Sequence, residues 1–326
     1  MNTISRLLSM AATAVVFAFS TACDNVTISG EPGEVLVVIN ADDWDGALGR
    51  TVQDSLGKEF PFIYGEQLYR MVHVMPSGFG KTFQMHRNIL QFVIDSSSEG
   101  KVEYLRDQWA HPQCVIRITA RDSEAAKQLF SSSSQKILAF LEEAERARVI
   151  DNCTDPTYED PTVGNALSGQ FGGSPHFMKG FTIKKRTDDF AWISSENNMQ
   201  MGVLMHIYPA LGDAFSRDSL LFHSSAMMHD NVPGSVDGSY MSISDHIDAV
   251  PSLEKVQYGG RNITEIRGRW NVTGDFMGGP FVAHAFPSQD GENVVLMLGY
   301  LYYPNRERPQ YLRKVQSMLY SFEWKK

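Results

Sequence analysis

The sequence has few cysteines, no excess of basic residues and no long apolar run after its first 20 residues. Its three cysteines among 326 residues lack the C-x-x-C spacing of redox and zinc motifs. The formal net charge of −9 argues against a nucleic-acid partner, because such binding needs basic surface to displace counterions from phosphates. No later apolar run reaches the roughly 20 residues of a transmembrane helix. No Walker loop or dinucleotide fingerprint is present, so we expect no cofactor.

The remaining composition is that of an ordinary globular protein. Hydrophobic residues make up 43%, charged residues 21% and aromatic residues 11% of the chain. These fractions exclude collagen-like, coiled-coil and disordered classes. The length is sufficient for one large core or two smaller ones, since domains usually contain roughly 100–200 residues.

The N-terminus has the pattern of a secretory signal. Arg6 precedes a mostly apolar stretch, LLSMAATAVVFAFS, and small residues lead to Cys23, which is typical of a cleaved signal peptide. A cysteine at this point resembles a bacterial lipoprotein signal, in which the thiol is acylated, for example by palmitate. We therefore expect residues 1–22 to be a signal peptide, Cys23 to be lipidated and residues 23–34 to form a tether.

This signal sequence predicts a protein of the cell envelope that is lipid-anchored to the outer membrane. In Bacteroidota, lipoproteins exported to the cell surface tend to carry several acidic residues directly after the cysteine. Asp24 is the one acidic residue directly after Cys23, which favours the side that faces the periplasm.

Cys114 and Cys153 are candidates for a disulfide in that oxidising compartment. Cys114 opens the apolar segment CVIRITA, and Cys153 follows a long helical pattern that begins near Ser123. If this helix packs antiparallel to the strand, its end returns towards the start of the strand and the two thiols meet. The alternative is that Cys114 is a small buried apolar residue and Cys153 a loop thiol.

Hydrophobic periodicity predicts an α+β fold with mainly antiparallel sheets packed by amphipathic helices. The first α+β unit spans residues 35–150, a Gly/Pro-rich connector spans residues 151–180 and a second unit spans residues 181–326. The expected strands are 35–39, 68–74, 88–94, 114–120, 181–184, 190–193, 203–208, 263–272, 280–286 and 294–303. Helices are expected over residues 42–56, 101–110, from 123 onwards, 211–229 and near the C-terminus.

The two units resemble each other weakly. Residues 35–56 and 203–220 share a pattern of Val-Leu, Ala-Leu-Gly and Asp-Ser-Leu, and each half ends with an apolar strand followed by an amphipathic helix. We therefore favour a duplicated α+β unit. The alternative is one continuous sheet that both halves share.

No catalytic residue can be assigned from a motif. The Ser-x-x-Lys pair Ser133–Lys136 has no Lys-Thr-Gly partner, and no Gly-x-Ser-x-Gly occurs. The richest zone of metal-type side chains contains His223, His229, Asp230, Asp245 and His246. Since its first two histidines are six residues apart rather than four, they do not share one face of a helix. We therefore predict no metal site.

A glycine-rich segment is a candidate ligand or partner loop. It contains Asp275, Gly278, Gly279 and Pro280, and His284 follows within the next apolar strand. Paired glycines allow close approaches that other residues exclude. The alternative interpretation is a tight turn or bulge between core aromatic residues.

The same segment, RGRWNVTGDFMGGPFVAH over residues 267–284, together with Cys23 and the chain length, resembles a family of Bacteroidota envelope lipoproteins of about 330 residues. That family is known only as a domain of unknown function, and it implies no catalytic residue, cofactor or substrate. We therefore expect a lipid-anchored, non-enzymatic binding or accessory module. Its partners would be the membrane, through the lipid, and another envelope protein or a glycan. The alternative is a hydrolase that acts on an envelope glycan or peptide polymer.

Overall fold

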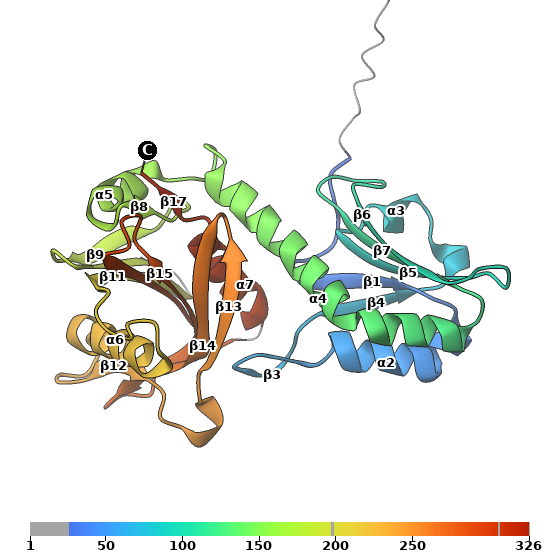
Figure 1. Ribbon diagram of the computed structural model, residues 1–326. Coiled ribbons are helices and arrows are strands. Elements are labelled where there is room, and N and C mark those ends of the chain that lie inside the picture. Colours follow the sequence, from blue (N-terminus) through green and yellow to red (C-terminus); the bar gives the residue numbers. More distant parts are fainter. Residues whose placement is uncertain (1–25, 197–198, 306, 326) are drawn as a thin grey trace, which may run out of the picture.

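The protein consists of two α+β lobes that are joined by one long helix (Figure 1). A computed structural model describes residues 26–196, 199–305 and 307–325. The signal peptide predicted for residues 1–22 and the lipidation predicted at Cys23 lie outside these described residues. Within them, no helix combines the length and the apolar character that a membrane span requires.

The first lobe contains a five-stranded sheet in the order β4-β1-β5-β7-β6. The contacts of β1 with β4 and β5, and of β5 with β7, are parallel, whereas β6 pairs antiparallel with β7. Its elements are β1 (Glu34–Val38), α1 (Ala41–Asp45), α2 (Ala47–Leu56), β2 (Glu59–Phe60), β3 (Ile63–Gln67), β4 (Arg70–Val74), η1 (Pro76–Gly78), α3 (Lys81–Gln84), β5 (Asn88–Ile94), β6 (Lys101–Arg106), β7 (Cys114–Ala120) and α4 (Ser123–Thr154).

The second lobe contains an antiparallel sheet in the order β12-β14-β15-β16-β11-β10-β9, and β13 also pairs with β14. Its elements are α5 (Pro161–Phe171), β8 (Gly173–Ser174), β9 (Thr182–Arg186), β10 (Phe190–Glu196), β11 (Gln200–Pro209), α6 (Arg217–Asn231), β12 (Tyr240–Ile243), η2 (Ile247–Ala249), β13 (Ser252–Tyr258), β14 (Arg261–Thr273), β15 (Gly278–Pro287), β16 (Asn293–Tyr302), α7 (Arg308–Tyr320) and β17 (Glu323–Trp324).

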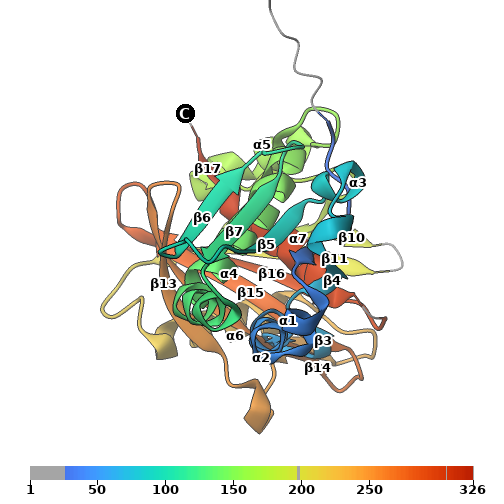
Figure 2. The same cartoon turned by 90° about the vertical axis from the view of Figure 1, so that its right-hand side faces the viewer.

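The hydrophobic cores explain how the lobes are held together. One continuous core includes Val37 of the first sheet, Leu141 of α4, Val315 of α7 and Met297 of the second sheet. A separate core lies on the other face of the second sheet, where Leu220 and other residues of α6 pack. Helices α4 and α7 therefore lie between the two sheets. Figure 2, which looks onto the first lobe, shows α4 running from below strands β5 and β7 away from the viewer, towards the second lobe.

The structure differs from the sequence-based expectation most clearly in two segments. Residues 101–106, expected to be helical, form strand β6, because Val102 and Tyr104 alternate towards α4 while Leu105 packs on the opposite face. Residues 161–171, expected to be part of a connector, form helix α5, whose first turn is capped by Asp160. Helix α5 buries Val163, Leu167 and Phe171, which are four residues apart and share one face.

The fold class is α+β, as predicted, but the predicted duplication is not visible in the strand arrangement. The first sheet is mostly parallel, whereas every strand contact in the second sheet is antiparallel. The lobes also have separate sheets, so the continuous-sheet alternative does not hold either. A strand followed by an amphipathic helix is a local pattern that both topologies contain.

Candidate binding cleft between the lobes

Three elements from distant parts of the sequence form the lobe junction: helix α4, helix α7 and the hairpin of β2 and β3. The hairpin belongs to the first lobe but reaches the second. Arg308 Nε lies 2.5 Å from Glu66 Oε1, and Arg269 donates a hydrogen bond to the carbonyl oxygen of Phe62 at 3.0 Å. The hydroxyl of Tyr64 donates to the carbonyl oxygen of Asp248. These contacts hold the hairpin against the second sheet.

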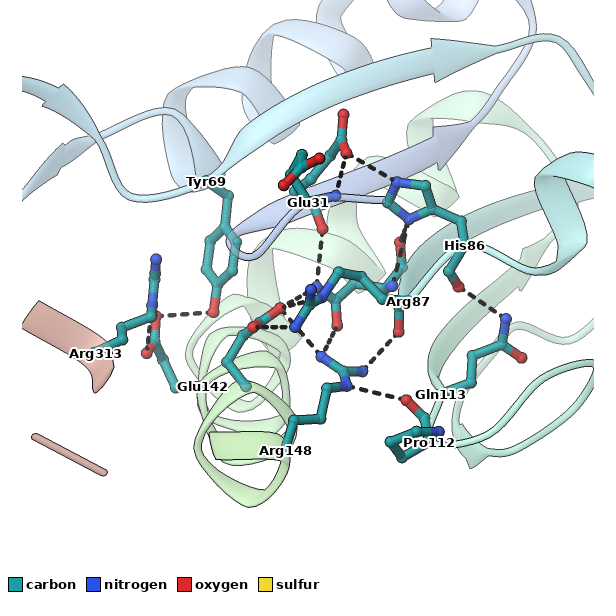
Figure 3. A network of polar contacts seen from close by, with 12 residues as sticks. Glu31, Tyr69, His86, Arg87, Pro112, Gln113, Glu142, Arg148 and Arg313 are labelled. Atoms are coloured by element: carbon teal, nitrogen blue, oxygen red, sulfur yellow. Dashed lines mark hydrogen bonds and ion pairs between the residues drawn. The ribbon is translucent and has the colours of Figure 1, made fainter. Parts of the chain in front are cut away.

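An ion pair between the buried Arg313 of α7 and the partly buried Glu142 of α4 lies at the lobe junction. Arg313 Nη2 donates to Glu142 Oε1 at 2.6 Å and to the carbonyl oxygen of Leu68 at 2.8 Å. The hydroxyl of Tyr69 also donates to this carboxylate at 2.8 Å, as Figure 3 shows. Burial would raise the pKa of Glu142, but the adjacent Arg313 guanidinium outweighs it and lowers that pKa. This ion pair therefore joins the two lobes.

A second buried cluster anchors α4 to the first sheet (Figure 3). Glu145 accepts hydrogen bonds from Arg87 at 2.9 Å, from Arg148 at 3.1 Å and from the amide of Asn88 at 2.7 Å. Arg148 also donates to the carbonyl oxygens of Arg87 and Pro112. The Glu145 side chain is 3% exposed. One carboxylate thus bridges two guanidinium groups, and the cluster fixes the position of α4.

Glu265 of β14 is a buried acid that lines the cavity between the lobes. Its Oε1 accepts from Arg267 at 2.8 Å, and its Oε2 accepts from the hydroxyl of Tyr320 at 2.7 Å. The side chains of Gln316 and His284 also donate to Oε2, each at 3.1 Å. Burial raises the pKa of Glu265, but Arg267 and the hydrogen bonds outweigh it, so the pKa lies well below the usual range. Both oxygens of this ionised carboxylate are occupied, which makes it a poor general base.

His284 of β15 contacts Glu265 through its ring. Its side chain is fully buried, and burial lowers its pKa, so the neutral ring donates its Nε2 hydrogen to Glu265. Its Nδ1 has no hydrogen-bond partner among the described residues. The ring is packed edge-on against Tyr320, with 4.4 Å between centroids. His284 thus positions Glu265 and is covered by Tyr320.

The cleft itself is a cavity of about 340 Å³ between the lobes. Four basic and three acidic side chains line it, an excess of one positive charge in an acidic chain. Its lining residues are Lys58, Phe60, Pro61, Leu68, Leu138, Ala139, Glu142, Arg146, Glu254, Val256, Glu265, Arg267, Arg313, Gln316, Ser317 and Tyr320.

Two of the four basic groups are free to bind a ligand. Arg313 and Arg267 are engaged by Glu142 and Glu265. In contrast, no carboxylate among the described residues lies within ion-pair distance of Lys58 or Arg146. The Arg146 guanidinium lies over the Tyr320 ring, 4.1 Å from its centroid. This stacking holds the group in place and leaves its N–H donors available.

The two candidate disulfide cysteines are free and buried in the structure. Cys114 lies near Arg148 and Glu145, whereas Cys153 lies near Lys314 and Glu159. Helix α4 continues past the start of β7, and the five residues from Arg148 to Cys153 add about 7 Å at 1.5 Å per residue. The helix therefore carries Cys153 into the second lobe. Burial raises the pKa of each thiol to about 12.

The candidate ligand loop separates into two parts. Gly278, Gly279 and Pro280 begin β15 and pair with β14. A Cβ at Gly279 would lie 2.0 Å from the carbonyl oxygen of Leu301, so this glycine is needed for strand packing. Asp275 lies in the turn before β15, where its carboxylate accepts a hydrogen bond from Ser235. His284 lies apart from them, beneath the interlobe cleft.

The His- and Asp-rich zone is also divided. His229, Asp230 and Asp245 line one surface groove, but His223 stacks on Tyr208 with ring centroids 3.6 Å apart. His246 is exposed and lies beside Asp248. Among the described residues, no three His, Cys, Asp or Glu side chains are grouped so that they could hold a metal ion.

Sequence reasoning missed the residues that build the cleft: Glu142, Arg146, Glu265, Arg267 and Arg313. A signal was present at Arg313, which lies between the apolar residues Leu312 and Val315 on the buried face of α7. A charged residue on an apolar helix face indicates a buried partner. The partner itself lies 171 residues earlier in the chain, and no local pattern identifies it.

The fold and the cleft define a two-lobed α+β protein with a charged cleft between its lobes. Residues 28–154 match the family model described as Domain of unknown function (DUF8532). Residues 160–321 match the model described as Domain of unknown function (DUF4837). The two models match consecutive parts of the chain, and the boundary between the matched parts falls where α4 ends. No curated protein matches the chain.

Proposed function

We propose that the protein is a non-enzymatic binding module that holds a small anionic ligand in the interlobe cleft. The observation that carries this proposal is the presence of Lys58 and Arg146 in a cleft whose two most buried carboxylates are already bonded. A guanidinium group held against a tyrosine ring is suited to bind a carboxylate or phosphate through paired N–H donors. The cavity volume is near the lower end for small-ligand sites, which usually have about 300–1,000 Å³.

Substitution of Arg146 by glutamine is expected to weaken anion binding. Loss of a charge-assisted hydrogen bond costs about 1.5–3 kcal/mol, which corresponds to roughly ten- to a hundredfold in the dissociation constant. The measurement is isothermal titration calorimetry of the protein with citrate and with inorganic phosphate, at constant ionic strength.

Arg121→Gln is the matched control, because it removes the same charge from a side chain that is 72% exposed and lies outside the cleft lining. It should leave the dissociation constant unchanged. If both variants weaken binding equally, the effect is one of net charge, and the cleft is not the site.

We also propose that Cys23 carries a lipid that anchors the protein to the outer membrane, on the side that faces the periplasm. In this setting the anionic ligand is an acidic group of another envelope protein or of a glycan. The sequence pattern around Cys23 supports this proposed location. Residues 26–33 then connect the anchor to β1.

Replacement of Cys23 by serine is expected to release the protein from membranes, because serine lacks the thiol that receives the lipid. Membrane and soluble fractions of cells that express each variant are compared after labelling with radioactive palmitate. Asn25→Ala, which keeps the thiol, should remain labelled and membrane-bound. Membrane association of the Cys23→Ser variant would refute the anchor and would leave the cleft proposal unaffected.

A further inference from the structure

A second concave site lies on the second lobe, between α6 and the strands β12 and β14. It is a groove of about 500 Å³, and Figure 1 shows α6 and β12 at the lower left of the second lobe. Its lining residues are Phe222, Ser225, Ala226, His229, Asp230, Tyr240, Ser242, Ile243, Asp245, Asn271 and Thr273.

The floor of the groove is polar and comes from two paired strands. Ser242 lies opposite Asn271, and Tyr240 lies opposite Thr273, in the register of β12 and β14. The Ser242 hydroxyl is 3.3 Å from Asn271 Oδ1 and 3.1 Å from Thr273 Oγ1. These groups provide both hydrogen-bond donors and acceptors on one small surface.

The walls of the groove are aromatic. Phe222 of α6 lines the groove and is 68% exposed, so its aromatic surface is accessible to a ligand. His229 packs edge-on against Tyr240, with 4.2 Å between ring centroids. The groove thus combines exposed aromatic surface with a polar floor.

The charge of this groove is opposite to that of the interlobe cleft. Among the described lining residues there is no lysine or arginine, whereas Asp230 and Asp245 are both present. An anionic ligand would meet two carboxylates in this lining, while the nearby Lys185 ammonium contacts the carbonyl oxygen of Asp230. A neutral or positively charged ligand would not meet this repulsion.

From these features we infer that the groove binds a saccharide whose units are neutral or carry an amine. A pyranose ring presents apolar C–H groups on its faces and hydroxyl groups around its edge. Phe222 and Tyr240 offer surface for the C–H faces, while Ser242, Asn271 and Thr273 offer partners for the hydroxyls. Asp230 and Asp245 accept hydrogen bonds from hydroxyl or ammonium groups and disfavour acidic sugars. This inference is independent of the anion proposed for the interlobe cleft.

The test is calorimetric titration of the full chain with three linear tetrasaccharides: β-1,4-linked glucosamine, its N-acetylated counterpart and α-1,4-linked galacturonate. The glucosamine or N-acetylglucosamine tetramer is expected to bind at least about tenfold more tightly than the galacturonate tetramer. Phe222→Ala should weaken that binding by about tenfold, because it removes the aromatic surface against which a pyranose ring would pack. Asn271→Ala should weaken it as well.

Leu211→Ala is the matched control, since Leu211 is a 79% exposed apolar residue of the same lobe that does not line the groove. It should leave binding unchanged. The inference is overturned if the galacturonate tetramer binds most tightly, or if no tetramer binds at millimolar concentration. It is also overturned if Leu211→Ala weakens binding as much as Phe222→Ala.

Discussion

Replacement of Glu145 by alanine is expected to lower the free energy of unfolding by about 3–5 kcal/mol, because it removes one side of a buried ion cluster. Arg87 and Arg148 both donate to this carboxylate, and their side chains are only 11% and 7% exposed. The variant leaves two buried guanidinium groups without a counter-charge, which is more costly than loss of a hydrogen bond alone. Urea unfolding followed by circular dichroism measures the change.

Glu143→Ala provides the control on the same helix. Glu143 is 60% exposed and pairs with Arg106, which is 44% exposed, and exposed pairs contribute about 0–1 kcal/mol. The two variants remove the same charge and the same number of atoms. A loss below about 1 kcal/mol for Glu145→Ala would show that the cluster does not hold α4 in place.

Replacement of Arg313 by alanine is expected to destabilise the protein by about 2–4 kcal/mol, between the values for exposed and fully buried pairs. Arg313 is 5% exposed, whereas its partner Glu142 is 29% exposed, so water compensates part of the lost contact. The variant also leaves the carbonyl oxygen of Leu68 without its donor. Arg313 belongs to the second lobe, whereas Glu142 and Leu68 belong to the first. We therefore expect the two lobes of the variant to unfold at different urea concentrations.

A double-mutant cycle distinguishes the contribution of the Arg313–Glu142 ion pair from the other effects of each substitution on stability. The Arg313→Ala and Glu142→Ala changes in unfolding free energy should not add, because the second substitution removes a group that has already lost its partner. Lys314→Ala, at the neighbouring position of α7, is the control for removal of a positive charge. Strict additivity of Arg313→Ala and Glu142→Ala would contradict the lobe-joining role of this pair.

The spacing of apolar residues correctly predicted those strands and helices that are determined by their local sequence. Strands β14, β15 and β16 and helix α7 follow from regular apolar spacing, because each buries one or both faces in a core. The hairpin of β2 and β3 was not predicted. It consists of strands of two and five residues, and it is held by Arg269 and Arg308 of the other lobe, so its stability does not arise from its own sequence.

The cleft could not be predicted from the sequence for a related reason. Lys58, Arg146 and Glu265 come from segments that are roughly 90 to 210 residues apart, and each is an ordinary charged residue in its local context. They meet because α4 extends beyond the first sheet and packs against α7. His284 was named as a candidate together with the glycine-rich segment, in the apolar strand that follows it. The contact of His284 with Glu265 of β14 could not be predicted, because it depends on the pairing of β15 with β14.

The central claim is that an anionic ligand binds between the two lobes, and hydrogen–deuterium exchange with and without citrate tests it most directly. We expect citrate to slow amide exchange in α4 around residues 138–146 of the first lobe. In the same experiment, residues 254–267 of β13 and β14 in the second lobe should also be protected. Arg146→Gln should remove both effects. Protection confined to one lobe, or to the groove between α6 and β12, or no protection at saturating citrate, would contradict the claim.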